Sequence, residues 1–369
     1  QLARESIVML KNEDNLLPID KNIRSIAVIG PNADNLYNQL GDYTAPQRKN
    51  TGFTVLQGLE SVAPPQTELI YAKGCGIRDM SKEGFQEAID AAKRADIAVV
   101  VLGGSSARDF STVFDINGAA IIGGDPAEMD CGEGVDLADL ELGGVQVELL
   151  KEIEKTGTPV VVVLIQGRPH AIPWIAENCK AILCGWYPGK EGGRAIAEVL
   201  FGDYNPSGKL SVSIPRASAQ LPVYYNHKDL GLVNSYLDMD RAPLYHFGHG
   251  LSYTEFKYSN LEVLDGELTV KDLQEGKNIK VKVSVENTGD LPGEEVVQLY
   301  ILDLEASIMR RIKELKGFKK MHLNPGEKRD VIFTLGEEEL GIWNREMEFC
   351  VEPGNVKIFV GGNSQDNLE

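Results

Sequence analysis

The segment PVVVVLIQG, residues 159–167, decides the fold class of this 369-residue sequence. Valines, a leucine and an isoleucine follow one another without a polar interruption, and a glutamine and a glycine close the segment. The run has the length of a strand and falls well short of the ~20 apolar residues that cross a membrane. A continuous apolar run of this kind is typical of a strand with both faces covered, as in a parallel sheet.

Similar apolar runs lie on both sides of this segment. They are IAVIG (26–30), TELIYA (67–72), IAVVVLGG (97–104) and AILCGWYPG (181–189). Amphipathic stretches such as SKEGFQEAIDAAKRA (81–95) occur between them. The alternation predicts an α/β fold with a mostly parallel sheet covered by helices, from Ile26 to about Phe201. In such a sheet, ligands bind at the loops that follow the carboxyl ends of the strands.

From about Tyr253 onward the apolar pattern changes to a period of two residues. The segment NIKVKVSVENTG (278–289) has apolar residues at alternate positions, namely Ile279, Val281, Val283 and Val285. Short runs of the same kind follow, separated by Gly, Pro and Asn turns: EEVVQLYILD (294–303), RDVIFTL (329–335), EMEFCVEPG (346–354) and NVKIFVGG (355–362). This pattern predicts a second, all-β domain, a sandwich of the immunoglobulin or fibronectin type.

The composition limits the classes of partner. With 43% hydrophobic and 25% charged residues the chain has the composition of a folded globular protein, and its length fits about two domains. The formal net charge of -18 argues against nucleic acid or an anionic membrane as a partner, because a phosphate-binding surface needs clustered Lys and Arg. A neutral or cationic ligand fits this charge better.

Several familiar site signatures are missing. The segment GGSS (103–106) lacks the spacing of a dinucleotide fingerprint and the ending of a P-loop, and no GxSxG nucleophile elbow occurs. The histidines of HFGHG (246–250) have no carboxylate or thiolate nearby in the sequence, so a structural turn is favoured. The five cysteines form neither a CxxC pair nor a zinc quartet, which predicts free thiols. We therefore predict no metal site and no cofactor.

An acidic loop, EMDCGEGVDLADLELGG (128–144), ends the long connection that follows the run at 97–104. Long loops at the carboxyl edge of a sheet are usually functional, although acidic loops are also commonly no more than solvated. Glu133 lies between two glycines, which let the backbone approach a ligand and leave the carboxylate free to project. Val145, Leu149 and Ile153 then continue at helical spacing, so a helix is expected where the loop ends.

Several long motifs carry a resemblance to a known family. They are ESIVMLKNEDNLLPI (5–19), IAVIGPNAD (26–34), LGDYTAPQ (40–47), GKEGGRAIAEVLFGDYNPSGKLSVSIP (189–215), PLYHFGHGLSYT (243–254) and IKELKGFKKMHLNPGEKRDVIFTL (312–335). Together they closely resemble the carboxyl-terminal region of glycoside hydrolase family 3, which contains β-glucosidases and β-xylosidases. GGSSARDF (103–110) and the acidic loop look most like the β-xylosidase branch.

The resemblance implies a domain organisation. Family members have an amino-terminal (β/α)8 barrel, a six-stranded α/β sandwich and a fibronectin type III-like domain, and this chain resembles the last two. We expect the α/β sandwich domain at residues 1–215, an ordered connector at 216–256 and the fibronectin type III-like domain at 257–369. The family's nucleophile is an aspartate of the barrel, and no segment of this sequence resembles the motif around it.

The resemblance also implies a general acid/base in the acidic loop. The family pattern Glu-Gly-x-Asp-Arg matches Glu133, Gly134 and Asp136, so Glu133 is the predicted acid/base, with Glu128 as the alternative. Leu137 departs from the pattern, because the family often has Arg there, and a possible partner of Asp136 is therefore missing.

Other loops at the same edge resemble segments that approach the family's active site. We predict substrate contacts for Tyr43, Arg108, Asp109 and Asp136. Packing between loops, or an ion pair, is the alternative role for these side chains.

These expectations together describe half of an enzyme. The chain is expected to be the carboxyl-terminal part of a retaining, exo-acting β-glycosidase that supplies the acid/base, and to be inactive alone because the nucleophile is absent. Its expected partners are an oligosaccharide or aryl glycoside and the missing barrel domain, while homo-oligomer formation is left open. The alternatives are a carbohydrate-binding module or a structural module without catalysis.

The start of the sequence yields two further expectations. LARESIVMLKN (2–12) has Leu2, Ser6 and Met9–Leu10 along one face of a helical pattern, so the chain is expected to open with a helix. The abrupt start at Gln1 suggests truncation, more by engineering than by natural processing. Free cysteines favour the cytoplasm weakly, and a periplasmic or secreted location stays open because any leader would lie upstream.

Overall fold

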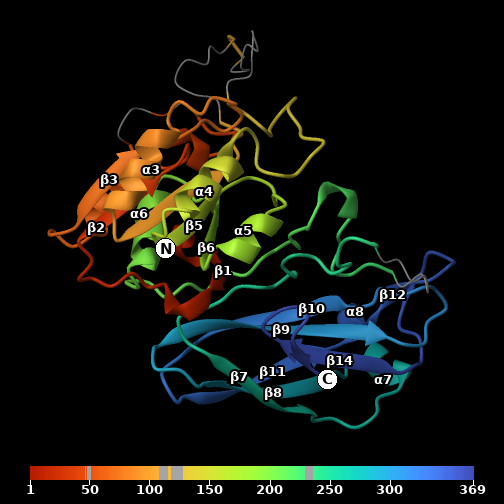
Figure 1. Cartoon of the computed structure of the whole chain (residues 1–369). Helices are drawn as coiled ribbons and strands as arrows, with labels where there is room; N and C mark the ends of the chain where they lie inside the picture. Colours follow the sequence, from red (N-terminus) through yellow and green to blue (C-terminus); the bar gives the residue numbers. More distant parts are fainter. Residues whose placement is uncertain (46, 48–50, 108–114, 118–127, 229–235) are drawn as a thin grey trace. The chain divides into compact units, whose positions relative to one another are not determined.

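The structure is a computed structural model that describes residues 1–45, 47, 51–107, 115–117, 128–228 and 236–369. These residues form two compact units. The first unit comprises Gln1–Gly208 and Ile214–Leu221, and the second comprises Lys209–Ser213 and Pro222–Glu369. Each unit has its own sheet structure and its own core (Figure 1).

The first unit is a sheet covered by helices on both faces. Its strands are β1 (Val8–Asn12), β2 (Ser25–Ile29), β3 (Glu68–Ala72), β4 (Ile97–Gly103), β5 (Val160–Ile165) and β6 (Ala181–Trp186). Its helices are α1 (Leu2–Ser6), α2 (Val55–Val62), α3 (Phe85–Arg94), α4 (Gln146–Glu154), α5 (Pro173–Asn178) and α6 (Gly192–Leu200). Short 3-10 helices span Glu13–Asn15, Tyr37–Gln39 and Ser218–Gln220.

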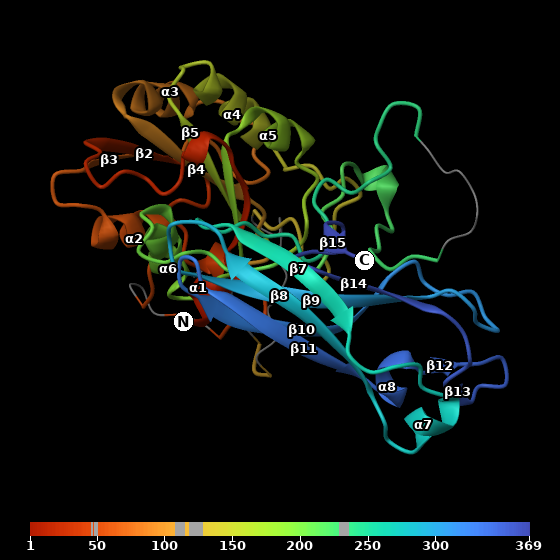
Figure 2. The same ribbon diagram turned by 90° about the horizontal axis from the view of Figure 1, so that it is seen from below.

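The strand order of this sheet is β1-β6-β5-β4-β2-β3. All neighbouring strands from β6 to β3 are parallel, and β1 is antiparallel to β6. Every residue of β4 and β5 is buried, because α3, α4 and α5 cover one face of the sheet while α1, α2 and α6 cover the other (Figure 2). The predicted α/β class and the mostly parallel sheet are therefore confirmed.

The opening of the chain differs from the helix expected for residues 2–12. Helix α1 ends at Ser6, and β1 follows it as the edge strand next to β6. The residues from Ile7 to Leu10 are all at most 2% exposed, which a strand covered on both faces achieves and a helix at the surface cannot. The helical prediction is wrong from Ile7 onward.

The second unit is a β-sandwich. Its strands are β7 (Phe256–Val263), β8 (Ile279–Asn287), β9 (Gly293–Asp303), β10 (Glu314–Leu323), β11 (Lys328–Leu335), β12 (Ile342–Trp343), β13 (Phe349–Cys350), β14 (Val356–Gly361) and β15 (Asn367–Leu368). Two short helices, α7 (Val270–Gln274) and α8 (Glu337–Leu340), lie between strands. One sheet has the order β10-β9-β14-β15 and the other the order β11-β8-β7.

The core of the sandwich follows from the period-two pattern. Val281, Val283 and Val285 of β8 are completely buried, and the alternate residues Lys280 and Lys282 are not. The inward side chains of β9 and β11 complete the same core. The prediction of an all-β domain after the α/β domain is confirmed.

Candidate active site

The sheet of the first unit has its topological switch point between β2 and β4. The chain leaves β2 toward β3 on one side and returns to β4 on the other side. The loops after β2 and β4 therefore diverge, and the space outside their carboxyl ends is where open α/β sheets bind ligands. The acidic loop belongs to the connection after β4, so the fold brings it to this position.

Glu133 lies at the tip of a tight turn in the acidic loop. Gly132 and Gly134 flank it with φ of +123° and +76°, and the Val135 N–H donates to Gly132 O at 3.2 Å. Glycine adopts such positive φ values without a steric penalty, so the two glycines permit the turn. Glu133 is an exposed residue.

Asp42, from the loop after β2, anchors this turn. The Glu133 N–H donates to Asp42 Oδ2 at 2.7 Å. A Cβ on Gly132 would lie 2.9 Å from the same oxygen, so the glycine also leaves room for the carboxylate. The next residue, Tyr43, is 88% exposed. The structure thus brings the Gly-Asp-Tyr segment to the Glu133 turn through Asp42, a residue that the sequence analysis did not single out.

Asp136 is paired with Arg168, which comes from the loop after β5. Arg168 Nη1 lies 2.5 Å from Asp136 Oδ1, and this hydrogen bond lowers the pKa of the Asp136 carboxyl. The Asp136 side chain is otherwise 82% exposed. The partner for Asp136 that Leu137 cannot provide is therefore Arg168, from the loop after the neighbouring strand β5. An arginine directly after the QG turn of β5 was the available sequence signal, and it was missed.

The other predicted residues lie away from this turn or outside the described residues. Glu128 is half-buried, and its Oε2 accepts a hydrogen bond from the Ile77 N–H at 3.1 Å. A Cβ on Gly76 would lie 2.1 Å from Glu128 Oε1, so this carboxylate packs directly on the backbone of the loop after β3. Arg108 and Asp109 fall outside the residues that the structure describes.

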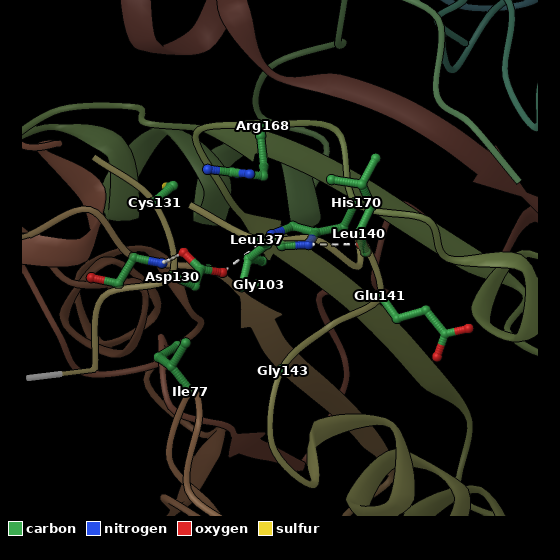
Figure 3. A network of polar contacts seen from close by, with 12 residues as sticks. Ile77, Gly103, Asp130, Cys131, Leu137, Leu140, Glu141, Gly143, Arg168 and His170 are labelled. Atoms are coloured by element: carbon green, nitrogen blue, oxygen red, sulfur yellow. Dashed lines mark hydrogen bonds and ion pairs between the residues drawn. The ribbon is translucent and has the colours of Figure 1, made fainter. Parts of the chain in front are cut away.

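A buried polar network holds the start of the acidic loop (Figure 3). Asp130 and Ser105 bond twice, because the Ser105 N–H donates to Asp130 Oδ1 at 2.8 Å and the Asp130 N–H donates to Ser105 O at 2.8 Å. His170 Nε2 lies 3.5 Å from Asp130 Oδ2, and both side chains are fully buried. Burial lowers the pKa of His170, and the Asp130 carboxylate opposes this shift. These polar side chains fix the loop to the end of β4.

The same network extends to the loop after β2. Ser105 Oγ donates to Asn38 Oδ1 at 2.7 Å, and Asn38 Nδ2 donates to Asn32 Oδ1 at 2.6 Å. Asn32 Nδ2 lies 3.2 Å from Leu102 O and 3.4 Å from Ile165 O. Asparagine side chains thus connect the ends of β2, β4 and β5 through direct hydrogen bonds.

Gln146, the first residue of α4, binds the backbone of two other loops. Its Oε1 accepts from the Gly103 N–H at 3.0 Å, and its Nε2 donates to Gly103 O at 2.9 Å and to Ile77 O at 3.0 Å. The side chain is completely buried. Nε2 also lies 3.3 Å from Gly143 O, so one amide joins the loop after β3 and the end of β4 to the end of the acidic loop; Ile77, Gly103 and Gly143 are labelled in Figure 3.

The described residues hold no group of three or more His, Cys, Asp or Glu side chains that could bind a metal ion. No helix in the described ranges has the length and apolarity needed to cross a bilayer. All five cysteines are free thiols.

Two models of known protein families match this chain. The model for the glycosyl hydrolase family 3 C-terminal domain matches residues 7–253, and the model for a fibronectin type III-like domain matches residues 295–364. These two matches identify the chain as part of a glycoside hydrolase. The chain belongs to glycoside hydrolase family 3, as the resemblance predicted.

Individual relatives agree with this assignment. A beta-xylosidase of Formosa agariphila is 44% identical over 100% of this chain and 48% of its own length. A periplasmic beta-glucosidase of Salmonella typhimurium is 36% identical over 99% of the chain and 48% of its own length. Among solved structures, a β-glucosidase of Erythrobacter marinus matches 99% of the chain and 48% of its own length, with 40% identity and a TM-score of 0.85. The chain spans about half the length of the relatives that it matches.

Proposed function

We propose that this chain is the carboxyl-terminal part of a retaining, exo-acting β-glycosidase that removes terminal non-reducing β-linked xylose or glucose. The names of its relatives, a beta-xylosidase and beta-glucosidases, support this class of substrate. A retaining glycosidase uses two carboxyl groups about 5–5.5 Å apart, one as nucleophile and one as acid/base. In this proposal Glu133 is the acid/base, and the nucleophile belongs to the barrel domain implied by the family.

The geometry of the Glu133 turn is the observation that carries this proposal. Its backbone is held by the carboxylate of Asp42, and Glu133 is exposed between two glycines of positive φ. In the first step the Glu133 carboxyl donates its proton to the glycosidic oxygen, and in the second the carboxylate takes a proton from the attacking water. Glu128 is less suited to this role, because its carboxylate packs on the backbone at Gly76 and accepts from Ile77.

Other residues at this edge are proposed to bind substrate. The Asp136 carboxylate, held by Arg168, offers acceptors for sugar hydroxyls. The exposed ring of Tyr43 offers an apolar face for stacking on a sugar ring. Arg108 and Asp109 remain proposals that rest on the sequence resemblance.

The test uses the protein in which this chain is joined to its barrel domain. Glu133→Ala should lower kcat for an aryl β-xyloside or β-glucoside with a poor leaving group by about 10²–10⁴-fold, because proton donation is lost. For a dinitrophenyl glycoside, whose aglycone leaves without proton donation, the glycosyl-enzyme should accumulate in Glu133→Ala, and azide should restore turnover by attacking it directly, with a glycosyl azide as the product. The chain alone should show no hydrolysis above background.

Glu128→Ala is the matched control, because it removes a carboxylate from the same loop. It should leave kcat within a few-fold of the parent and should give no azide product. An unimpaired Glu133→Ala variant together with an azide-rescued Glu128→Ala variant would move the acid/base to Glu128. Hydrolysis by the chain alone would overturn the assignment of the nucleophile to the barrel.

A further inference from the structure

His170 connects the two ends of the loop that carries Glu133. His170 Nδ1 lies 3.0 Å from Leu140 O, and its Nε2 lies 3.5 Å from Asp130 Oδ2 (Figure 3). Because a carbonyl oxygen can only accept, Nδ1 must be the donor to Leu140. Residues 130 and 140 bracket the Glu133 turn, so a single ring meets the chain both where the loop begins and where it ends.

Each of these ends is also fixed to backbone that follows a strand of the sheet. At the first end, Asp130 bonds in both directions with the backbone of Ser105, directly beyond β4. At the second end, Leu140 O also accepts from the Ala171 N–H at 2.9 Å, beside His170. The loop from Asp130 to Leu140 therefore forms an arch that is held at both ends, and the His170 ring lies between these two ends.

The ring of His170 is shielded from solvent. The residue is 1% exposed, and Asp130 is 1% exposed as well. Neither His170 Nε2 nor Asp130 Oδ2 makes a hydrogen bond within the described residues, so these two buried polar atoms face each other. Burying both groups is unfavourable, since each lacks a hydrogen bond at these atoms. The presence of both side chains despite this cost supports a role for them in arranging the 130–140 loop.

A second contact from the same segment supports this role. Arg168, two residues before His170, binds Asp136, which follows the Glu133 turn. The loop after β5 therefore touches the Glu133 loop at residues 130, 136 and 140. The two residues that directly flank Glu133 are glycines, which have no side chain to supply such support.

We infer that His170 is a positioning residue, which sets the closure of the 130–140 loop and thereby aims Glu133 at the glycosidic oxygen; this inference rests on the proposed function. A displacement of about 1 Å at a catalytic group can reduce turnover about 10²-fold, so the spacing between residues 130 and 140 affects the rate through the position of Glu133. His170 itself does not touch the substrate.

The first experiment uses this chain and does not depend on activity. His170→Leu removes both contacts, His170→Asn keeps a donor near the Nδ1 position, and His170→Gln places an amide near the Nε2 position. Amide hydrogen exchange of residues 131–139 should rise at least tenfold in His170→Leu and less in His170→Asn. Thr158→Val, which removes the hydrogen bond to Ala92 O at 2.8 Å elsewhere in the unit, should leave exchange of these amides unchanged.

The second experiment uses the barrel-containing protein and a series of aryl glycosides. If the acid is misplaced, reactions that need proton donation should suffer most. His170→Leu should therefore lower kcat/KM about 10²-fold for poor leaving groups and less than about 3-fold for dinitrophenyl glycosides, with partial recovery in His170→Asn. A merely structural role would lower all substrates equally.

The outcomes separate this inference from the proposed function. If Glu133→Ala is crippled and rescued by azide while His170→Leu shows an unchanged leaving-group profile and unchanged exchange, the positioning role is wrong and the acid/base assignment stands. If Glu133→Ala is unimpaired, the acid/base assignment in the proposed function is wrong, whatever the exchange data show. Should His170→Leu fail to fold, the pair of His170→Asn and His170→Gln decides the question by the same two measurements.

Discussion

Gln146→Met is the substitution that most directly tests how the loops are held. It removes hydrogen bonds to the Gly103 N–H, to Gly103 O and to Ile77 O, all at 3.0 Å or less. A buried backbone group that loses its partner costs about 1–3 kcal/mol. Taking about 1 kcal/mol for each of these groups, the free energy of unfolding of the first unit should fall by roughly 3 kcal/mol. For a unit of this size that corresponds to a decrease in Tm of roughly 6–12 °C.

Urea unfolding followed by tryptophan fluorescence measures this change. Trp174 and Trp186 belong to the first unit, and Trp343 belongs to the second. In a Trp343→Phe background the fluorescence therefore reports the first unit by itself.

The matched control is Gln86→Met, since Gln86 is exposed on α3 and bonds to the exposed carboxylate of Asp90. It should change the free energy of unfolding by less than about 0.5 kcal/mol. A loss below about 1 kcal/mol for Gln146→Met would refute the reasoning, because it would mean that these backbone groups find other partners when the amide is gone.

Two further predictions concern the Glu133 turn and the buried histidine. Gly132→Ala places a methyl 2.9 Å from Asp42 Oδ2 at φ +123°, so it should lower the free energy of unfolding by about 2–3 kcal/mol. Gly134→Ala should lower it by about 1 kcal/mol, because the added methyl meets nothing within 4 Å. Equal costs in urea unfolding would contradict the close approach to Asp42. Burial lowers the pKa of His170 in the folded state, so below about pH 6.5 the unfolded chain binds more protons than the folded chain. The contribution of the neutral His170 to the free energy of unfolding is therefore complete above about pH 6.5 and should be lost as the pH falls toward the folded-state pKa. His170→Asn should reduce the slope of unfolding free energy against pH in that range, and an unchanged slope would count against a neutral His170 in the folded state.

The strands of the sheet were predictable because burial on both faces leaves a mark in the sequence. The valine run of β5 can be recognised without any knowledge of its neighbours. The edge strand β1 was not predictable in this way. Its residues also fit a short helical pattern, and its partner β6 lies about 170 residues further along the chain, so only the completed sheet selects the strand.

The candidate site likewise combines a local feature that the sequence predicts with long-range contacts that it does not. Glu133 could be singled out because glycines flank it, and a turn of this kind is a local property. Asp42 and Arg168 could not be connected to it from the sequence, since their contacts join residues 91 and 32 positions apart. The strand order decides which loops meet, and that order depends on packing over the whole sheet. The role of Glu128 was also undetermined, because its contact with Ile77 spans two loops.

The side chains that hold the loops mostly bind main-chain atoms. Asn32 and Gln146 bind backbone groups at the ends of strands, Asp42 binds the amide of Glu133, and His170 binds the carbonyl of Leu140. A backbone group is the same whatever residue carries it. Exposed side chains in these loops can therefore be exchanged during evolution without disturbing the framework, so the residues proposed to bind sugar could change while the proposed proton donor, Glu133, keeps its place.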